Sequence, residues 1–138
     1  LTGLKQFYEE VEAVAKRQGY VTTLGGRRRL LPDIHSANGQ NYALARRQAI
    51  NTVIQGSAAD IIKLAMLAVA HDAELKSMEA RLLLQVHDEL LLEVPTEAAA
   101  AAGERVAALM SGVMPGGAAL SVPLVVDWGK GRDWGSAH

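Results

Sequence analysis

The sequence of 138 residues contains no cysteine, few aromatic residues and no long apolar run. The absence of cysteine excludes a disulfide scaffold and a cysteine-ligated zinc site, and it fits a reducing compartment. No apolar run approaches the ~20 residues of a membrane span, and nothing at the start resembles a signal peptide, so we expect no membrane partner. An aromatic content of 4% is too low for a surface that stacks single-stranded bases.

Several common catalytic motifs are also missing. The sequence has no H-E-x-x-H pair, no G-x-S-x-G elbow and no phosphate-binding loop, so a zinc hydrolase or a serine nucleophile has no support. The length suits one domain or part of one. The chain starts at Leu1 inside a helical pattern, and we therefore expect a piece of a larger protein.

The net charge of −1 conceals an asymmetry. Residues 1–55 carry eight basic and four acidic side chains, whereas residues 56–138 carry six basic and eleven acidic ones. This division favours a polyanion bound by the first part and cation or carboxylate chemistry in the second. Salt-bridge partners that are unevenly distributed along the chain would give the same counts.

The pattern of apolar residues predicts an α+β fold with antiparallel β-hairpins packed on helices. Helical periodicity predicts helices at residues 3–18, 42–53, 57–73 and 96–114. Turn signals predict hairpins from residues 20–24 with 27–31 and from 81–86 with 90–94, and a last strand at 121–128. Ser57 and Asp60 have the spacing of a capping box, and Thr96 is placed to cap the final helix.

The tripeptide His87-Asp88-Glu89 separates two leucine-rich strands. A tight turn usually contains Asn-Gly or Asp-Gly, but this one puts two carboxylates beside apolar strands. Unpaired charge is unfavourable there and a divalent cation relieves it, with hard oxygen ligands favouring Mg²⁺ or Mn²⁺. A solvated polar turn is the alternative. The similar pair His71-Asp72 lies near a helix end, and we expect it to be structural only.

Arg47, Asn51 and Gln55 are spaced by four residues, which places them on one helical face if the helix continues past Val53. Their side chains provide donors for purine N3 and pyrimidine O2 in the minor groove of DNA. Those acceptors are nearly alike for every base pair, so such contacts test pair geometry without reading sequence. A solvated helix face is the alternative.

A second basic group consists of Arg27, Arg28 and Arg29 on a predicted strand, with Arg46 nearby in the sequence. Arginine contacts to phosphate position a nucleic acid without specifying its sequence. The alternative is a basic edge strand that discourages aggregation.

Together these segments resemble the family A DNA polymerases of the bacterial DNA polymerase I type. Residues 19–34 look like the family's fingers hairpin, residues 49–63 resemble its N-x-P-x-Q-G-T-A-A-D segment, and residues 84–90 are similar to its motif C. Trp134 with Ala137 and His138 looks like its C-terminal ending. Three positions depart from the pattern: Val53 replaces the proline, Ser57 the threonine, and Arg46 the usual glutamate.

The resemblance implies a segment of a right-hand polymerase that performs two-metal nucleotidyl transfer in DNA replication and repair. Residues 1–45 would form the rear of the fingers, and residues 46–138 the C-terminal part of the palm. Asp88 would ligate catalytic Mg²⁺, Glu89 would be its acidic neighbour, and His87 would lie near the primer's 3′ end.

The implied partners are primer-template DNA, a deoxynucleoside triphosphate and the remainder of the polymerase chain, in the cytoplasm at the nucleoid. Arg47, Asn51 and Gln55 would contact template and primer at the newest base pairs.

The family's first catalytic aspartate, in its D-Y-S-Q-I-E-L motif, is missing, and so is its O-helix. We therefore expect the 138 residues alone not to extend a primer. Three alternatives stay open: a non-catalytic duplex-DNA-binding module, an inert truncated fragment, and a metal-dependent phosphohydrolase that uses His87 and Asp88.

Overall fold

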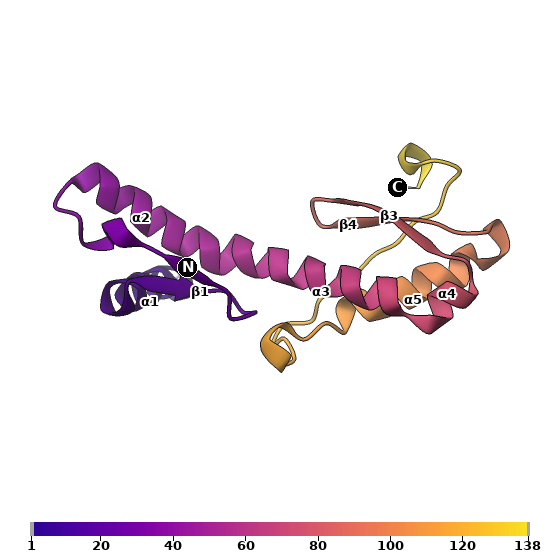
Figure 1. Cartoon of the computed structure of the whole chain (residues 1–138), viewed down its shortest axis with the longest axis horizontal. Coiled ribbons are helices and arrows are strands. Elements are labelled where there is room, and N and C mark those ends of the chain that lie inside the picture. The colour runs from indigo at the N-terminus through magenta and orange to yellow at the C-terminus, as the bar shows by residue number, and fades with distance from the viewer. Residues whose placement is uncertain (1, 138) are drawn as a thin grey trace. The chain divides into compact units, whose positions relative to one another are not determined.

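The computed structural model describes residues 2–137, and its α+β class agrees with the prediction (Figure 1). The chain divides into two compact units, Leu1–Asp60 and Ile61–His138, called unit 1 and unit 2 below. Within the described residues, each unit contains one two-stranded antiparallel sheet. The boundary between the units lies at residue 60, and the predicted division into fingers at 1–45 and palm at 46–138 stays a prediction.

Unit 1 begins with a helix and a hairpin, followed by a long helical stretch. Its elements are α1 (Thr2–Gln18), β1 (Tyr20–Thr22), β2 (Arg28–Leu30), η1 (Pro32–His35), α2 (Gly39–Asn51), the π-helical segment η2 (Thr52–Gly56) and the start of α3 (Ser57–His71). The end of α1 confirms the sequence prediction, because Gly19 has a φ of +76° and its amide donates to the Ala15 carbonyl at 2.8 Å.

The core of unit 1 joins α1, the hairpin and α2. Its buried residues are Val11, Ala15, Val21, Leu31, Ile34, Ala45 and Ala49. Helix α2 begins earlier than predicted, because the Asn38 side chain accepts hydrogen bonds from the amides of Gln40 and Asn41. The alanines of α2 let it approach α1 closely, which places the hairpin beside the later turns of the long helix.

Helix α3 starts at Ser57 as predicted, but the predicted capping box of Ser57 and Asp60 is wrong. The helix runs without interruption from Gly39 to His71, through the π-helical segment that contains Val53. The Ser57 hydroxyl donates to the Val53 carbonyl and accepts from the Leu24 amide, so it does not cap a helix. Asp60 pairs with Arg27 and does not reach back to Ser57. The hairpin turn supplies partners that compete successfully with the capping box.

By length and composition alone, this one helix of 33 residues could cross a membrane. That is weak evidence, because the core helix of a soluble protein meets the same criterion.

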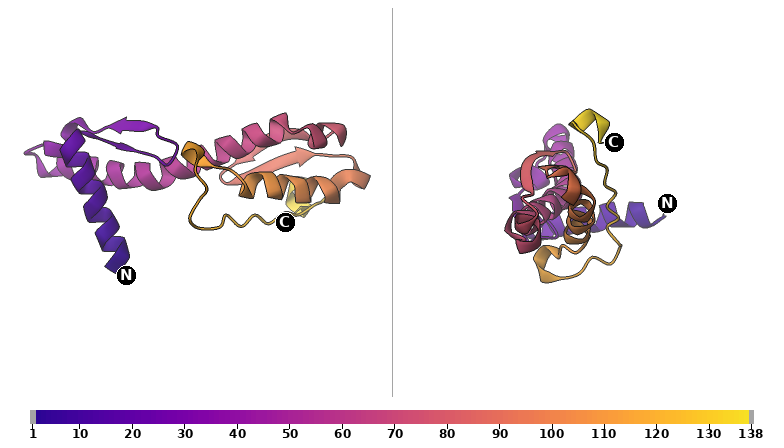
Figure 2. Two further views of the ribbon diagram at one scale, coloured as in Figure 1. Left: turned by 90° about the horizontal axis from the view of Figure 1, so that it is seen from below. Right: turned by 90° about the vertical axis from the view of Figure 1, so that its right-hand side faces the viewer.

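Unit 2 packs a hairpin against helices (Figure 2). After α3 come α4 (Ala73–Ser77), β3 (Arg81–Val86), β4 (Glu89–Glu93), η3 (Thr96–Ala98), α5 (Ala99–Ser111), η4 (Pro115–Gly117) and η5 (Trp134–Ser136). Val69, Leu75, Ala102 and Val106 form its buried cluster, and leucines of β4 pack on it. The register pairs Val86 with Glu89, with a bulge between Leu82 and Leu84.

Two further expectations are corrected in unit 2. Thr96 makes no side-chain cap; it lies in η3, and α5 starts at Ala99 without a side-chain hydrogen bond at its N-terminus. The strand expected at 121–128 is not formed, because β3 and β4 pair only with each other among the described residues and leave this alternating segment no partner. The C-terminal His138 lies outside the described residues.

The pair His71-Asp72 is structural, as predicted. Helix α3 ends at His71, and the Asp72 side chain caps α4 by accepting from the Leu75 amide at 2.9 Å. Asp72 also pairs with Arg105 of α5, and hydrogen bonding to this guanidinium lowers the pKa of the Asp72 carboxyl.

Candidate functional site

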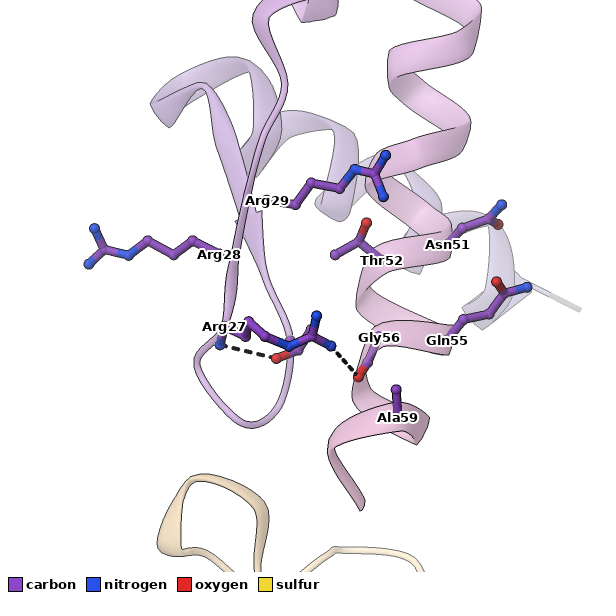
Figure 3. Close-up of a pocket in the computed structure, with 9 residues that line it drawn as sticks. Arg27, Arg28, Arg29, Asn51, Thr52, Gln55, Gly56 and Ala59 are labelled. Carbon is purple, nitrogen blue, oxygen red and sulfur yellow. Dashed lines mark hydrogen bonds between the residues drawn. The ribbon is translucent and has the colours of Figure 1, made fainter. Parts of the chain in front are cut away.

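A basic pocket of about 380 Å³ lies in unit 1, between the β1–β2 hairpin and the long helix (Figure 3). Its lining residues are Thr23, Arg27, Arg28, Arg29, Asn51, Thr52, Gln55, Gly56 and Ala59. Two groups that the sequence presents separately, the three arginines and the Asn-Gln pair, therefore meet at one concave surface.

The three adjacent arginines have different surroundings. Arg27 is held internally: its Nε lies 2.9 Å from Asp60 Oδ1, and one of its terminal nitrogens donates to the Gly56 carbonyl at 3.1 Å. Figure 3 shows Arg29 extending toward the helix and Arg28 away from it. The Arg28 guanidinium lies over the Tyr20 ring, 5.0 Å from its centroid. Within the described residues neither Arg28 nor Arg29 has an ion-pair partner, so both charges remain available to an anion.

The hairpin approaches the helix too closely for ordinary side chains. A Cβ on Gly25 would lie 2.8 Å from Asp60 Oδ2, and one on Gly56 would lie 2.7 Å from Thr23 Cγ2. Burial would raise the pKa of Asp60, but the neighbouring Thr23 hydroxyl, the hydrogen bond from Arg27 and the Arg27 charge together lower it. Asp60 is thus an anion held between the hairpin and the helix.

Asn51 and Gln55 are exposed and project from the same side of the helix (Figure 3). The helix does continue past Val53, which is the condition that the predicted shared face required, although it does so through a π-helical turn. Arg47 is exposed but does not line the pocket. The DNA contacts of these three residues stay predictions.

Arg46, predicted to contact DNA, forms a salt bridge with Glu12 of α1. Hydrogen bonds from Lys16, Tyr42 and Arg46 to this carboxylate lower the pKa of Glu12 from 4.5 to about 2. Much of the Arg46 charge is therefore balanced inside unit 1.

The acidic tip of unit 2 is a two-residue turn. His87 and Asp88 form the turn, and Glu89 is already the first residue of β4. His87 has a φ of +53°, in the left-handed region that glycine favours. The Gln85 side chain donates to the His87 carbonyl and fixes the turn from within the hairpin.

The side chains of Asp88 and Glu89 are exposed and form no hydrogen bond or ion pair with other residues between 2 and 137. In that same range no three His, Cys, Asp or Glu side chains are grouped to hold a metal ion. Two unpartnered carboxylates are hard oxygen donors, and they fit one side of a magnesium site.

Sequence reasoning did not identify the roles of Thr23, Ser57 and Asp60 beside the pocket. Asp60 lies 33 residues after Arg27, and no local periodicity marks a contact at that separation. The available signal was the glycine pair beside the arginines, because glycine permits close approach of the hairpin backbone to another element.

Three comparisons place the chain among known proteins. A family model described as DNA polymerase family A matches residues 1–136. DNA polymerase I of Pseudomonas aeruginosa is 47% identical over 136 residues, which cover 99% of this chain and 14% of that protein. DNA polymerase I of Geobacillus stearothermophilus is 49% identical over 132 residues, covering 96% of this chain and 15% of that protein.

A solved structure is similar as well. It is the POL domain of Pol1 from M. smegmatis in complex with DNA primer-template and dNTP, with a TM-score of 0.89 and 41% sequence identity. The match covers 99% of this chain and 23% of that one. The chain thus spans about one seventh of the length of the curated relatives.

Proposed function

Because the chain belongs to DNA polymerase family A, we propose that it is a segment of a DNA-directed DNA polymerase that performs template-directed nucleotidyl transfer. The family match along residues 1–136 carries this proposal, since it includes both the basic pocket and the acidic tip. The remainder of a polymerase chain, primer-template DNA and a deoxynucleoside triphosphate are the proposed partners. We place its action in the cytoplasm, at the nucleoid.

Asp88 and Glu89 are the proposed magnesium ligands, and they form one side of a two-ion site. Bound there, magnesium would stabilise negative charge while the primer's 3′ oxygen displaces pyrophosphate. The exposed Asp88 carboxylate has no partner among residues 2–137 to lose when it binds a cation. His87, next to it in the same turn, would lie near the primer's 3′ end.

The basic pocket is the proposed contact surface for the duplex. Arg28 and Arg29, which have no ion-pair partner in the described part of the chain, provide positive charges for phosphates. Asn51, Gln55 and the exposed Arg47 provide donors for the minor groove. Arg27 and Arg46 add to the positive potential of this surface, although each has an internal acidic partner. We assign residues 1–45 to the rear of the fingers and residues 46–138 to the palm.

The test is primer extension by the complete polymerase that contains this segment. Asp88→Asn should lower kcat by at least about a hundredfold, because metal ions contribute several kcal/mol of charge stabilisation, while the Kd for primer-template stays within about threefold. Glu93→Gln removes a carboxylate at the other end of the same hairpin and should change neither value. A fully active Asp88→Asn enzyme would overturn the assignment.

The purified 138 residues should not extend a primer, because the D-Y-S-Q-I-E-L aspartate and the O-helix are absent from them. Templated incorporation above that of an Asp88→Ala control would contradict this. The basic pocket also supports a second candidate, a non-catalytic duplex-binding module. That candidate would be favoured if the complete protein bound duplex DNA but did not extend a primer with magnesium and triphosphates present.

A further inference from the structure

The turn of the β1–β2 hairpin is attached to the long helix at the π-helical segment. Arg27 spans the gap with two bonds: its Nε donates to Asp60 at 2.9 Å, and a terminal nitrogen donates to the Gly56 carbonyl at 3.1 Å, the bond drawn in Figure 3. The Leu24 amide donates to the Ser57 hydroxyl at 2.9 Å. We call Arg27, Ser57 and Asp60 the hairpin–helix clasp.

The clasp is built into tightly packed surroundings. Ser57 is 5% exposed, and the Asp60 side chain is 13% exposed. Gly25 and Gly56 lack the Cβ atoms that would collide with Asp60 and Thr23. The hairpin turn therefore contacts the helix directly, and the clasp residues have little freedom to shift independently.

The π-helical segment that the hairpin contacts departs from regular α-helical geometry, so it needs stabilising contacts. π-Helical turns are rare, and they occur often at functional sites. Here the Ser57 amide donates to the Ile54 carbonyl, three residues earlier, while the Ser57 hydroxyl donates to the Val53 carbonyl. One side chain thus bonds the helix backbone and the hairpin backbone at the same time.

Asn51 immediately precedes the π-helical segment and Gln55 lies within it. The conformation of the segment therefore determines how these two side chains are placed relative to each other. We propose that Arg27, Ser57 and Asp60 are positioning residues, which hold the π-helical segment against the hairpin so that Asn51 and Gln55 keep the spacing needed for duplex contact. This inference rests on the proposed function of the pocket.

The direction in which a charge change shifts DNA affinity distinguishes this proposal from a purely electrostatic effect. Asp60→Asn removes a negative charge beside a basic pocket, which by charge alone should tighten DNA binding. Loss of positioning predicts the opposite, because Arg27 loses its ionic partner and the π-helical segment loses one of its attachments.

The experiment measures primer-template binding and discrimination between matched and mismatched primer ends in the complete polymerase. We expect Asp60→Asn to raise the Kd about fivefold to tenfold, a change equivalent to the net loss of one ordinary hydrogen bond, and to reduce mismatch discrimination. Asp33→Asn is the matched control: it makes the same charge change on an exposed residue of unit 1. It should leave binding unchanged or slightly tighter.

Two substitutions of the uncharged Ser57 test the positioning role independently, and they are sufficient if Asp60→Asn does not fold. Ser57→Ala removes the bridging hydroxyl and should weaken binding about threefold to tenfold. Ser57→Thr keeps the hydroxyl and should bind within about twofold of the parent. Thermal unfolding of each variant identifies general destabilisation, which would lower kcat at saturating DNA as well.

The outcomes distinguish this inference from the proposed function. If Asn51→Ala and Gln55→Ala weaken binding but Ser57→Ala equals the parent and a folded Asp60→Asn binds equally or more tightly, the positioning role is overturned and the duplex surface stands. If neither Asn51→Ala nor Gln55→Ala affects binding, the proposed duplex surface itself fails.

Discussion

Glu12 and Arg46 lie 34 residues apart in the chain, and their side chains form a salt bridge that joins α1 to α2. The same carboxylate accepts a hydrogen bond from Tyr42 and another from Lys16, whose Nζ lies 2.7 Å away. One acidic side chain of α1 therefore gathers three partners, two of them from α2, beside the buried core of unit 1.

The stability of unit 1 should decrease in acid because of Glu12. Its pKa is lowered from 4.5 to about 2 in the folded chain, so its stabilisation is complete above the unfolded value and is lost as the pH falls from 4.5 through 2. Glu12→Gln should lower the free energy of unfolding by on the order of 2 kcal/mol at pH 7. Urea unfolding at pH 7 and near pH 2 measures this difference, which should shrink in acid.

The exposed neighbour Glu10 provides the control for that experiment, because its side chain forms no ion pair among the described residues and only accepts a hydrogen bond from Gln6, one turn earlier on α1. Glu10→Gln should change stability by less than about 0.5 kcal/mol at either pH. An equal effect of Glu12→Gln at both pH values would contradict the linkage.

The salt dependence of duplex binding should separate the arginines by their internal partners. Arg28 and Arg29 have none among the described residues, so Arg28→Gln and Arg29→Gln should each reduce the slope of log K against log salt by about 0.9. Arg46→Gln should reduce it less, because Glu12 already balances that charge. Fluorescence anisotropy of a labelled duplex over a salt series measures the slopes. Equal slope changes for Arg29 and Arg46 would contradict this distinction.

Local signals in the sequence were sufficient for much of the fold. A glycine that ends α1 and a glycine pair between two strands each specify backbone geometry within a few residues. The end of α1 agrees with the prediction. The first hairpin is formed as predicted, but its strands cover only residues 20–22 and 28–30, not 20–24 and 27–31, so the connection is longer than the glycine pair alone. Ser57 and Asp60 fit a capping box equally well by spacing, but Leu24 and Arg27, about 33 residues earlier, take those side chains as partners. Competition of that kind depends on the tertiary fold, so a local pattern cannot detect it.

The candidate site, too, could be predicted from the sequence only in part. The chemical character of the acidic tip and of the basic residues is evident in the sequence, since it depends only on residue types and spacing. The difference between Arg27 and its two neighbours is not, because three consecutive arginines look alike until the fold brings Asp60 to one of them.

The segment after α5 should be held in place by Trp128. A Cβ on Gly103 would lie 2.3 Å from Trp128 Cε3, so the indole ring packs directly on the backbone of α5. Gly103→Ala should displace the ring and destabilise unit 2 by about 1–3 kcal/mol, despite the better helix propensity of alanine. Faster trypsin cleavage after Lys130 and Arg132 would report the release of this segment.

Gly3→Ala is the matched control for Gly103→Ala, because Gly3 also lies in a helix and no neighbour among the described residues lies within 4 Å of an added Cβ. It should leave the chain equally stable or slightly more stable. Unchanged trypsin cleavage in Gly103→Ala would contradict the packing role of Trp128.

The chain should be less stable with His87 than with a glycine at this position, but the complete polymerase should extend a primer better with His87. Its φ of +53° places a side chain with a Cβ in the left-handed region, at a cost of about 1 kcal/mol that glycine avoids. We expect His87→Gly to raise the free energy of unfolding by up to about 1 kcal/mol and to lower kcat/KM for primer extension by the complete polymerase.

Glu79 provides a closely matched control. Its φ of +58° gives it the same left-handed conformation, but it lies just after α4, away from the acidic tip. Glu79→Gly relieves the same backbone strain and should stabilise the chain while extension stays at the parental rate. If His87→Gly also kept the parental rate, the imidazole would have no part in extension, and the strained backbone at His87 would need an explanation other than catalysis. If His87→Gly lost activity and Glu79→Gly did not, the His87 side chain would contribute to primer extension. The left-handed conformation of His87 would then be retained despite its cost in stability, because the adjacent Asp88 acts beside the primer end.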